Sequence, residues 1–163
     1  MPPVQIRFDQ RLGQRARQLI EVESEVKPVV LDTNIVLDMF VFNDPATLTL
    51  KSAIKTSLTA GALQWKATPA MRDELERVLA YPHIALKLGL YKISSDAVLA
   101  QFDQWARLEP VAPKAPAVCK DPDDQKFIDL AVAHQALLLS KDQAVLCMKK
   151  RLLGLGVVVQ AAN

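Results

Sequence analysis

The sequence predicts an α/β fold of the three-layer kind, in which a parallel sheet of about five strands carries helices on both faces. Short apolar runs alternate along the chain with helical segments, and this alternation is typical of a parallel sheet with crossover helices. Two of the runs, VVL before Asp32 and LLLS before Lys141-Asp142, stop at an acid and are followed by helical sequence. A chain of 163 residues with 50% hydrophobic and 23% charged residues fits one globular domain.

The first half of the domain is expected to contain two strands and three helical segments. In order, these are a strand at 29–32, helical sequence at 35–40 and 45–59, a strand at 65–68 and a helix at 70–80. Gly61 is a suitable stop for the second helical segment. Thr68 followed by Pro69 is a cap residue followed by a proline at the first helical position, which indicates a helix start.

The second half is expected to continue the alternation. The segments are helices at 83–89 and 94–106, a short strand at 107–111, a helix opened by Asp121-Pro122, a strand at 137–140, a short helix capped by Asp142 and a last strand at 157–159. Segment 109–118 contains three prolines and is expected to be an exposed, extended connection.

Residues 1–27 are polar and charged, and we interpret them as an N-terminal arm that precedes a domain at 28–163. No apolar run approaches the ~20 residues that a membrane span requires, and the N-terminus lacks the apolar core of a signal peptide. Cys119 and Cys147 show no metal-ligand spacing. A cytoplasmic location is therefore expected.

The net charge of +2 is unevenly spread along the chain. Lys51 and Lys55 lie in a stretch, 45–72, that contains no acid, and Lys149, Lys150 and Arg151 lie in a second such stretch at the C-terminus. Basic shoulders beside an acidic site suit a nucleic-acid backbone. Ordinary solvated lysines are the alternative for either stretch.

Asp32 and Asp142 are both expected at the carboxyl ends of strands, the edge at which open α/β sheets bind ligands. Each also suits the simpler role of an N-cap for the helix that follows. An acid at the end of a central strand is costly to bury unless it is paired or bound to a metal, which favours a functional role for Asp32.

Glu74 and the acidic run at 121–124 supply further candidates. On a helical wheel Glu74 falls about 40° outside Val78, beside the apolar face of helix 70–80. Asp121 before Pro122 suits a cap that points outward, whereas Asp123 and Asp124 both flank the apolar stripe of the next helix. Spacing alone leaves Asp123 and Asp124 open as alternatives.

Four carboxylates at one sheet edge are hard to keep ionised without a cation, because two unit charges ~4 Å apart repel by ~4 kcal/mol at an effective dielectric of ~20. An oxygen-seeking ion such as Mg²⁺ or Mn²⁺ is the natural occupant. No serine, cysteine or lysine stands in an evident nucleophile constellation, so covalent catalysis is unsupported.

The motifs VVLDTNIVLD, TPAMRDELERVLAYP, DPDDQKFIDLAVA and LLLSKD together resemble the PIN domain, a nuclease fold, and most of all its branch of toxin–antitoxin toxins. The resemblance spans roughly Pro28 to Gln160, and the arm at 1–27 departs from it. It implies five parallel strands and Mg²⁺- or Mn²⁺-dependent cleavage of RNA. It also implies an antitoxin protein or a second copy of the chain as partners.

By the same resemblance, the catalytic and metal-binding acids are Asp32, Glu74, Asp124 and Asp142. Asn34 would support the first of them, Ser140 would add a hydroxyl, and Asp123 would share the third metal role. Three other functions stay open: an inactive RNA-binding or interaction module, a metal-dependent DNA nuclease, and an aspartyl-phosphate phosphatase. The last normally requires a second acid two residues after Asp32, where this chain has Asn34.

Overall fold

The computed structural model describes residues 26–42 and 45–161, so residues 1–25 of the predicted arm lie outside it. One sheet of five parallel strands has the order β3-β2-β1-β4-β5. The strands are β1 (Lys27–Leu31), β2 (Leu63–Ala67), β3 (Ala106–Leu108), β4 (Leu137–Ser140) and β5 (Val158–Ala161). The predicted α/β fold with about five parallel strands is confirmed.

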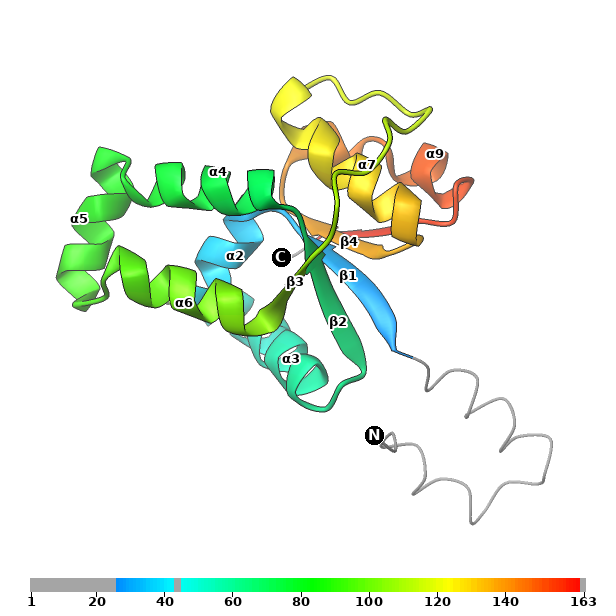
Figure 1. Ribbon diagram of the computed structural model, residues 1–163. Coiled ribbons are helices and arrows are strands. Elements are labelled where there is room, and N and C mark those ends of the chain that lie inside the picture. Colours follow the sequence, from blue (N-terminus) through cyan, green and yellow to red (C-terminus); the bar gives the residue numbers. More distant parts are fainter. Residues whose placement is uncertain (1–25, 43–44, 162–163) are drawn as a thin grey trace, which may run out of the picture.

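Helices cover both faces of this sheet (Figure 1). Between β1 and β3 the chain forms α2 (Thr33–Phe40), η2 (Pro45–Thr47), α3 (Leu48–Thr59), α4 (Pro69–Leu79), α5 (Pro82–Tyr91) and α6 (Ser95–Trp105). After β3 it forms η3 (Pro122–Asp124), α7 (Gln125–His134), α8 (Gln143–Leu146) and α9 (Lys149–Leu153). None of the described helices combines the length and the apolarity that crossing a bilayer needs.

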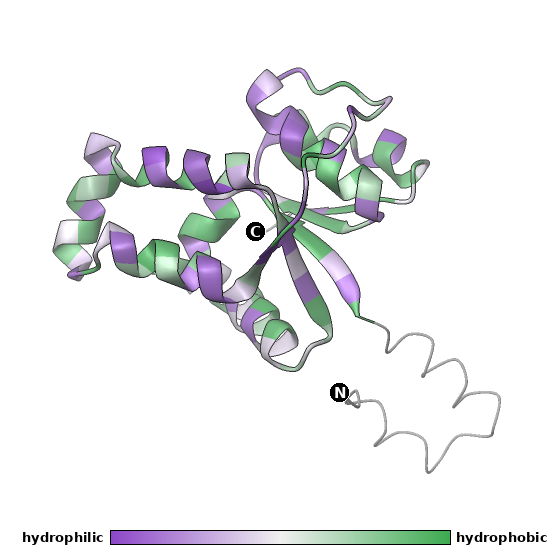
Figure 2. Ribbon diagram, viewed as in Figure 1, coloured by the Kyte–Doolittle hydropathy of each residue, from purple (hydrophilic) through white to green (hydrophobic). Residues whose placement is uncertain are grey.

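The core lies between the helices and the central strands. Figure 2 shows β1 and β4 as largely hydrophobic, with hydrophilic colour at the start of β1. On β2, the indole of Trp65 is 1% exposed and meets the ring of Phe102 edge-on, with 4.9 Å between ring centroids. This contact holds α6 against the sheet. Helices α4, α5 and α6 project away from the sheet to one side (Figure 1).

Two expectations from the sequence need correction. The third strand ends at Leu108 rather than at 111, because Glu109 makes one last bond to the Ala67 carbonyl (2.7 Å) and Pro110 has no N–H to continue the ladder. The proline-rich segment after it belongs to no helix or strand, but it is not wholly exposed. Between residues 115 and 119 every second residue is buried, namely Ala115, Ala117 and Cys119.

The side chains of α7 explain that burial. Asp129 accepts a hydrogen bond from the Ala115 N–H (2.8 Å), and Gln125 both donates to the Ala117 carbonyl (3.0 Å) and accepts from the Cys119 N–H (2.7 Å). Buried main-chain groups of an irregular segment need such partners. The segment is thereby fixed against α7 just before the acidic run.

Candidate metal centre and nucleic-acid site

The strand order reverses between β1 and β4, which are neighbours at the centre of the sheet although they are far apart in sequence. In open α/β sheets the crevice beside the carboxyl ends of strands at such a reversal is the usual ligand site. Asp32 directly follows β1, and Asp142 follows β4 by two residues. The fold therefore places both strand-end acids at this crevice.

Asp32 is buried, with 3% of its surface exposed. As N-cap of α2 it accepts the Ile35 N–H (3.0 Å), and its other oxygen accepts the hydroxyl of Ser140. Burial raises the pKa of Asp32, while the hydrogen bonds from Ser140 and from the main-chain N–H groups of Ile35 and Lys141 lower it. Both oxygens of this carboxyl are thus held in fixed directions.

Ser140 links the two strand-end acids. Its hydroxyl is fully buried, donates to Asp32 and accepts the Asp142 N–H (3.0 Å). Asp142 in turn caps α8 by accepting the Ala144 N–H (2.9 Å). The predicted N-caps at Asp32 and Asp142 therefore both form, and the same two side chains lie at the crevice.

The acidic run forms η3 and brings its side chains to different places. Asp121 caps η3 by accepting the Asp123 N–H (3.0 Å), as predicted. Its predicted outward direction is wrong, because one of its carboxylate oxygens lies within 4.8 Å of oxygens of both Asp124 and Asp142. The side chain of Asp123 is exposed, and its carboxylate is not part of this group of three.

The reason for Asp121's position lies in its own turn. A carboxylate that caps the N–H two residues ahead is held against its own turn, and here it lies beside Asp142, which follows β4 by two residues. The helical wheel places residues around a helix axis and carries no information about a residue in the preceding loop.

Asp124 has the most perturbed electrostatics of the described acids. Burial, a proton shared with Asp142, and the charges of Asp142, Asp121 and Asp32 raise the pKa of Asp124 to about 8. With the carboxyls ionised, its Oδ2 is buried and receives no hydrogen bond. A buried carboxylate oxygen without a donor is costly, and a divalent cation is the partner that this oxygen lacks. These residues therefore fit a hard metal ion.

Glu74 lies across the crevice and holds two other elements. Its Oε2 accepts the hydroxyl of Thr33 at the start of α2, and its Oε1 accepts the ammonium of Lys126 on α7 (2.7 Å). Lys126 also donates to the Asp123 carbonyl (2.5 Å) and lies 4.9 Å from the centroid of the Phe127 ring. Glu74 is thus positioned by contacts from both sides of the sheet.

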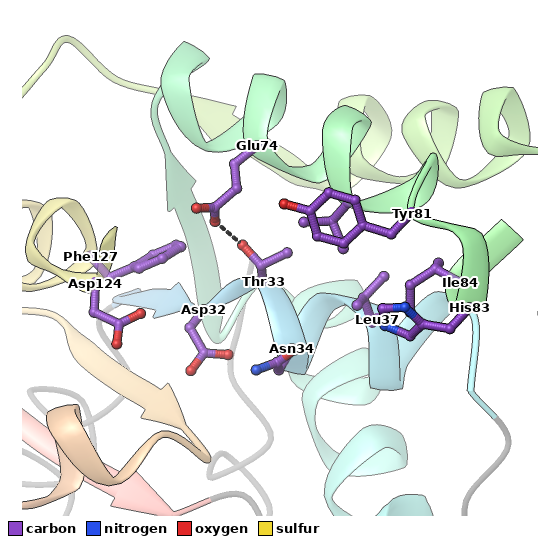
Figure 3. A pocket seen from close by; sticks show the side chains of 11 residues that line it. Asp32, Thr33, Asn34, Leu37, Glu74, Tyr81, His83, Ile84, Asp124 and Phe127 are labelled. Atoms are coloured by element: carbon purple, nitrogen blue, oxygen red, sulfur yellow. Dashed lines mark hydrogen bonds between the residues drawn. The ribbon is translucent and has the colours of Figure 1, made fainter. Parts of the chain in front are cut away.

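One pocket of about 260 Å³ joins these acids (Figure 3). Figure 3 shows the carboxyls of Asp32 and Asp124 side by side, with Glu74 on the other side of Thr33. Asp124 belongs both to this pocket and to the group that includes Asp121 and Asp142. The exposed Asn34, predicted to support Asp32, also lines the pocket.

The predicted basic contacts lie outside this lining. Lys51 and Lys55 are on α3, where the Lys55 ammonium is 6.0 Å from the centroid of the Phe40 ring. Burial, followed by the charge of Lys55, lowers the pKa of Lys51. Lys149, Lys150 and Arg151 are exposed on α9. Their role in binding nucleic acid stays a prediction.

Comparison with known families identifies the family of the chain. The sequence profile of the PIN domain matches residues 28–144, which span β1 to α8 and all the acids described above. The chain belongs to the PIN domain family. PIN domains are nuclease-type folds that often act as metal-dependent ribonucleases, which agrees with the acidic group of this one. No curated protein matches the sequence.

Two residues of this PIN domain were missed by sequence reasoning. Lys126 had no signal of its own, since a lysine next to an acidic run is ordinary. Asp38 is a buried acid on α2 that forms an ion pair with Lys141, although its Oδ2 is not aligned for a hydrogen bond. An acid within the apolar face of VVLDTNIVLD was the available signal for it.

The Asp38–Lys141 pair has a positional consequence. Lys141 binds α2 twice, through its main-chain N–H to Asp32 and through its ammonium to Asp38. The connection that carries Ser140 and Asp142 is thereby fastened to the helix that Asp32 caps.

Proposed function

We propose that this PIN domain is an endoribonuclease that hydrolyses RNA phosphodiester bonds with the help of Mg²⁺ or Mn²⁺. The observation that carries the proposal is the buried Oδ2 of Asp124, which receives no hydrogen bond when the carboxyls are ionised and lies beside the carboxylates of Asp142 and Asp121, at the point where the strand order reverses. Such a site is unfavourable in the apo protein and becomes favourable when a cation binds.

Asp124 and Asp142 are the proposed direct ligands, with Asp121 as an additional neighbour that the sequence did not suggest. Asp32 is proposed to face the same cation or a water bound beside it, held by Ser140. Glu74 is proposed to complete the site from the far wall of the pocket. Asp123 remains a weaker alternative, because its side chain is exposed.

A bound Mg²⁺ or Mn²⁺ would polarise the phosphate and lower the pKa of water at the site. The chain's own carboxylates would orient the attacking water, with Asp142 as the fourth acid that completes the site. Ser140 is unsuited to nucleophilic attack, because it is fully buried and its hydroxyl is engaged by Asp32 and Asp142.

The substrate backbone is proposed to run over basic residues on α3 or α9, whose lysines and arginine were predicted from the sequence. A role as the toxin of a toxin–antitoxin pair, an antitoxin partner and a homodimer are further proposals that rest on family resemblance. A small reading frame next to the gene would support the first two.

A cleavage assay with purified protein tests the proposal. RNA and single-stranded DNA of equal sequence are incubated with Mg²⁺, with Mn²⁺ and with EDTA. We expect RNA to be cut in either metal and to stay intact in EDTA. Cutting of DNA alone would favour the DNA-nuclease alternative, and binding of RNA without any cutting would favour the inactive binding module.

Lys126 provides a more specific prediction. We expect Lys126→Met to lower kcat/KM about 10- to 100-fold, the range typical of residues that orient a ligand, because it releases Glu74 Oε1. The melting temperature should hardly move, since partly exposed ion pairs contribute about 1 kcal/mol or less. Lys120→Met is the matched control, because Lys120 is an exposed lysine six residues before Lys126, and this variant should cleave like the parent.

A further inference from the structure

The pocket that contains the acids extends well beyond them. Away from the carboxylates it is lined by Leu37, Val78, Tyr81, His83 and Ile84, at the corner where α4 passes into α5. No step proposed above uses this half of the pocket. Its character is also different, because it offers rings and aliphatic carbon instead of charge.

The two rings at the corner lie close together. The centroids of Tyr81 and His83 are 6.2 Å apart, and the ring planes are inclined by 34°. Tyr81 is the extended N-cap residue of α5, and Pro82 follows it as the first helical residue. Proline fixes the backbone at this corner, and the buried Ile84 anchors the same turn.

Tyr81 is nevertheless 48% exposed. Figure 3 shows its ring over the pocket, with the hydroxyl directed toward the end where Glu74 and Thr33 lie, and His83 near Leu37 and Ile84. An aromatic side chain that is fixed, half-exposed and part of a pocket wall presents a face on which a flat ligand can stack.

The two halves of the pocket together indicate the class of ligand. The carboxylate half suits a phosphodiester held through a cation, and the ring half suits a planar base. Glu74 is followed by a little more than one turn of α4, which ends at Leu79, about 7 Å along the axis at ~1.5 Å per residue. Tyr81 lies two residues beyond that end, at the start of α5. A pocket of about 260 Å³ is smaller than the ~300–1,000 Å³ of sites that enclose drug-sized ligands, and this size favours a ligand as small as a single nucleoside.

We propose that Tyr81 and His83 form a subsite that stacks one unpaired nucleobase of the RNA, in a nucleotide next to the bond that is cut. This inference rests on the proposed ribonuclease function and names residues for substrate selection. Stacking on aromatic side chains is how proteins hold single-stranded nucleic acid with little dependence on base identity. The subsite should therefore bind any unpaired base and distinguish little between the four bases.

The test measures binding and cleavage by the full chain with two oligoribonucleotides, one intact and one with an abasic nucleotide beside the cleaved bond. Binding is followed in EDTA, where metal-dependent cleavage is off, and cleavage is followed in Mn²⁺. We expect Tyr81→Ala to weaken binding of the intact oligonucleotide roughly 5- to 100-fold, the effect of losing the stacking of one base. Tyr81→Phe should bind like the parent.

The abasic substrate makes the result specific. The parent should lose affinity for it by a similar factor, whereas Tyr81→Ala should discriminate much less between the two oligonucleotides, since the main partner for the base is already gone. His83→Ala should show a smaller effect in the same direction. Tyr91→Ala is the matched control, because Tyr91 is a comparably exposed tyrosine (42%) at the other end of α5.

The outcomes separate the two proposals. If the protein cleaves RNA but Tyr81→Ala still discriminates against the abasic nucleotide as the parent does, the subsite is wrong and the ribonuclease stands. If neither cleavage nor binding of RNA occurs, the proposed function fails and the subsite fails with it. Binding without cleavage, lost in Tyr81→Ala, supports the subsite in an RNA-binding module.

Discussion

Asp124→Asn is expected to abolish cleavage and, at the same time, to raise the melting temperature of the metal-free protein at pH 8. Cleavage should fall by more than the 10- to 100-fold typical of residues outside the direct ligands. Stability should rise because the substitution removes a half-buried charge, whose buried Oδ2 lacks a donor and which is repelled by the charges of Asp142, Asp121 and Asp32.

The sign of the pH dependence follows from the direction of the shift. The pKa of Asp124 is about 8 in the folded protein, against an ordinary value of 3.8. Between these values the folded chain holds a proton that the unfolded chain has released, so the free energy of unfolding decreases as pH rises. The melting temperature of metal-free parent protein should therefore fall between about pH 4 and pH 8, and that of Asp124→Asn should fall less.

Calorimetry or circular dichroism in EDTA across that range, paired with cleavage in Mn²⁺, measures both effects. Each kcal/mol changes the melting temperature of a domain this size by roughly 2–4 °C. Asp123→Asn is the matched control, since its exposed side chain lies outside the acid group, and it should alter neither slope nor stability. Equal pH slopes for the parent and Asp124→Asn would contradict the placement of Asp124.

Local sequence rules account for most of the fold. The caps at Asp32, Thr68, Asp121 and Asp142 all form where a cap residue precedes a helix, and they fix the starts of helices to within a residue or two. The apolar runs before Asp32 and Asp142 become the two central strands. These features depend on neighbours along the chain, which the sequence displays directly.

What the sequence did not display are contacts between distant elements. Lys126 and Glu74 are 52 residues apart, and their contact exists only because α4 and α7 flank the same crevice. The same holds for Asp38 and Lys141, which meet across α2 and the end of β4. A helical wheel gives the face on which a residue lies, but the partner on that face depends on strand order.

Asp32→Asn is expected to abolish cleavage while leaving the melting temperature close to that of the parent. Asparagine caps helices about as well as aspartate, so the bond from the Ile35 N–H survives. Burial raises the pKa of Asp32, so its ionised form is destabilised in the folded protein. Removing that charge offsets the stability lost when Ser140 donates to an amide in place of a carboxylate. The loss of activity would then be chemical and not a consequence of unfolding.

Asp32→Ala separates these contributions, because it also loses cleavage but removes the hydrogen bonds that the carboxyl accepts from Ile35, Ser140 and Lys141. Losing an N-cap typically costs ~1 kcal/mol, and leaving the buried Ser140 hydroxyl without its acceptor costs a further ~1–3 kcal/mol. The melting temperature should fall by roughly 4–16 °C at ~2–4 °C per kcal/mol. Thermal melting and cleavage of Asp32→Asn, Asp32→Ala and parent protein, side by side, measure this. Normal turnover by purified Asp32→Asn would remove Asp32 from the site, and an Asp32→Asn protein as unstable as Asp32→Ala would show that the carboxylate is needed for folding.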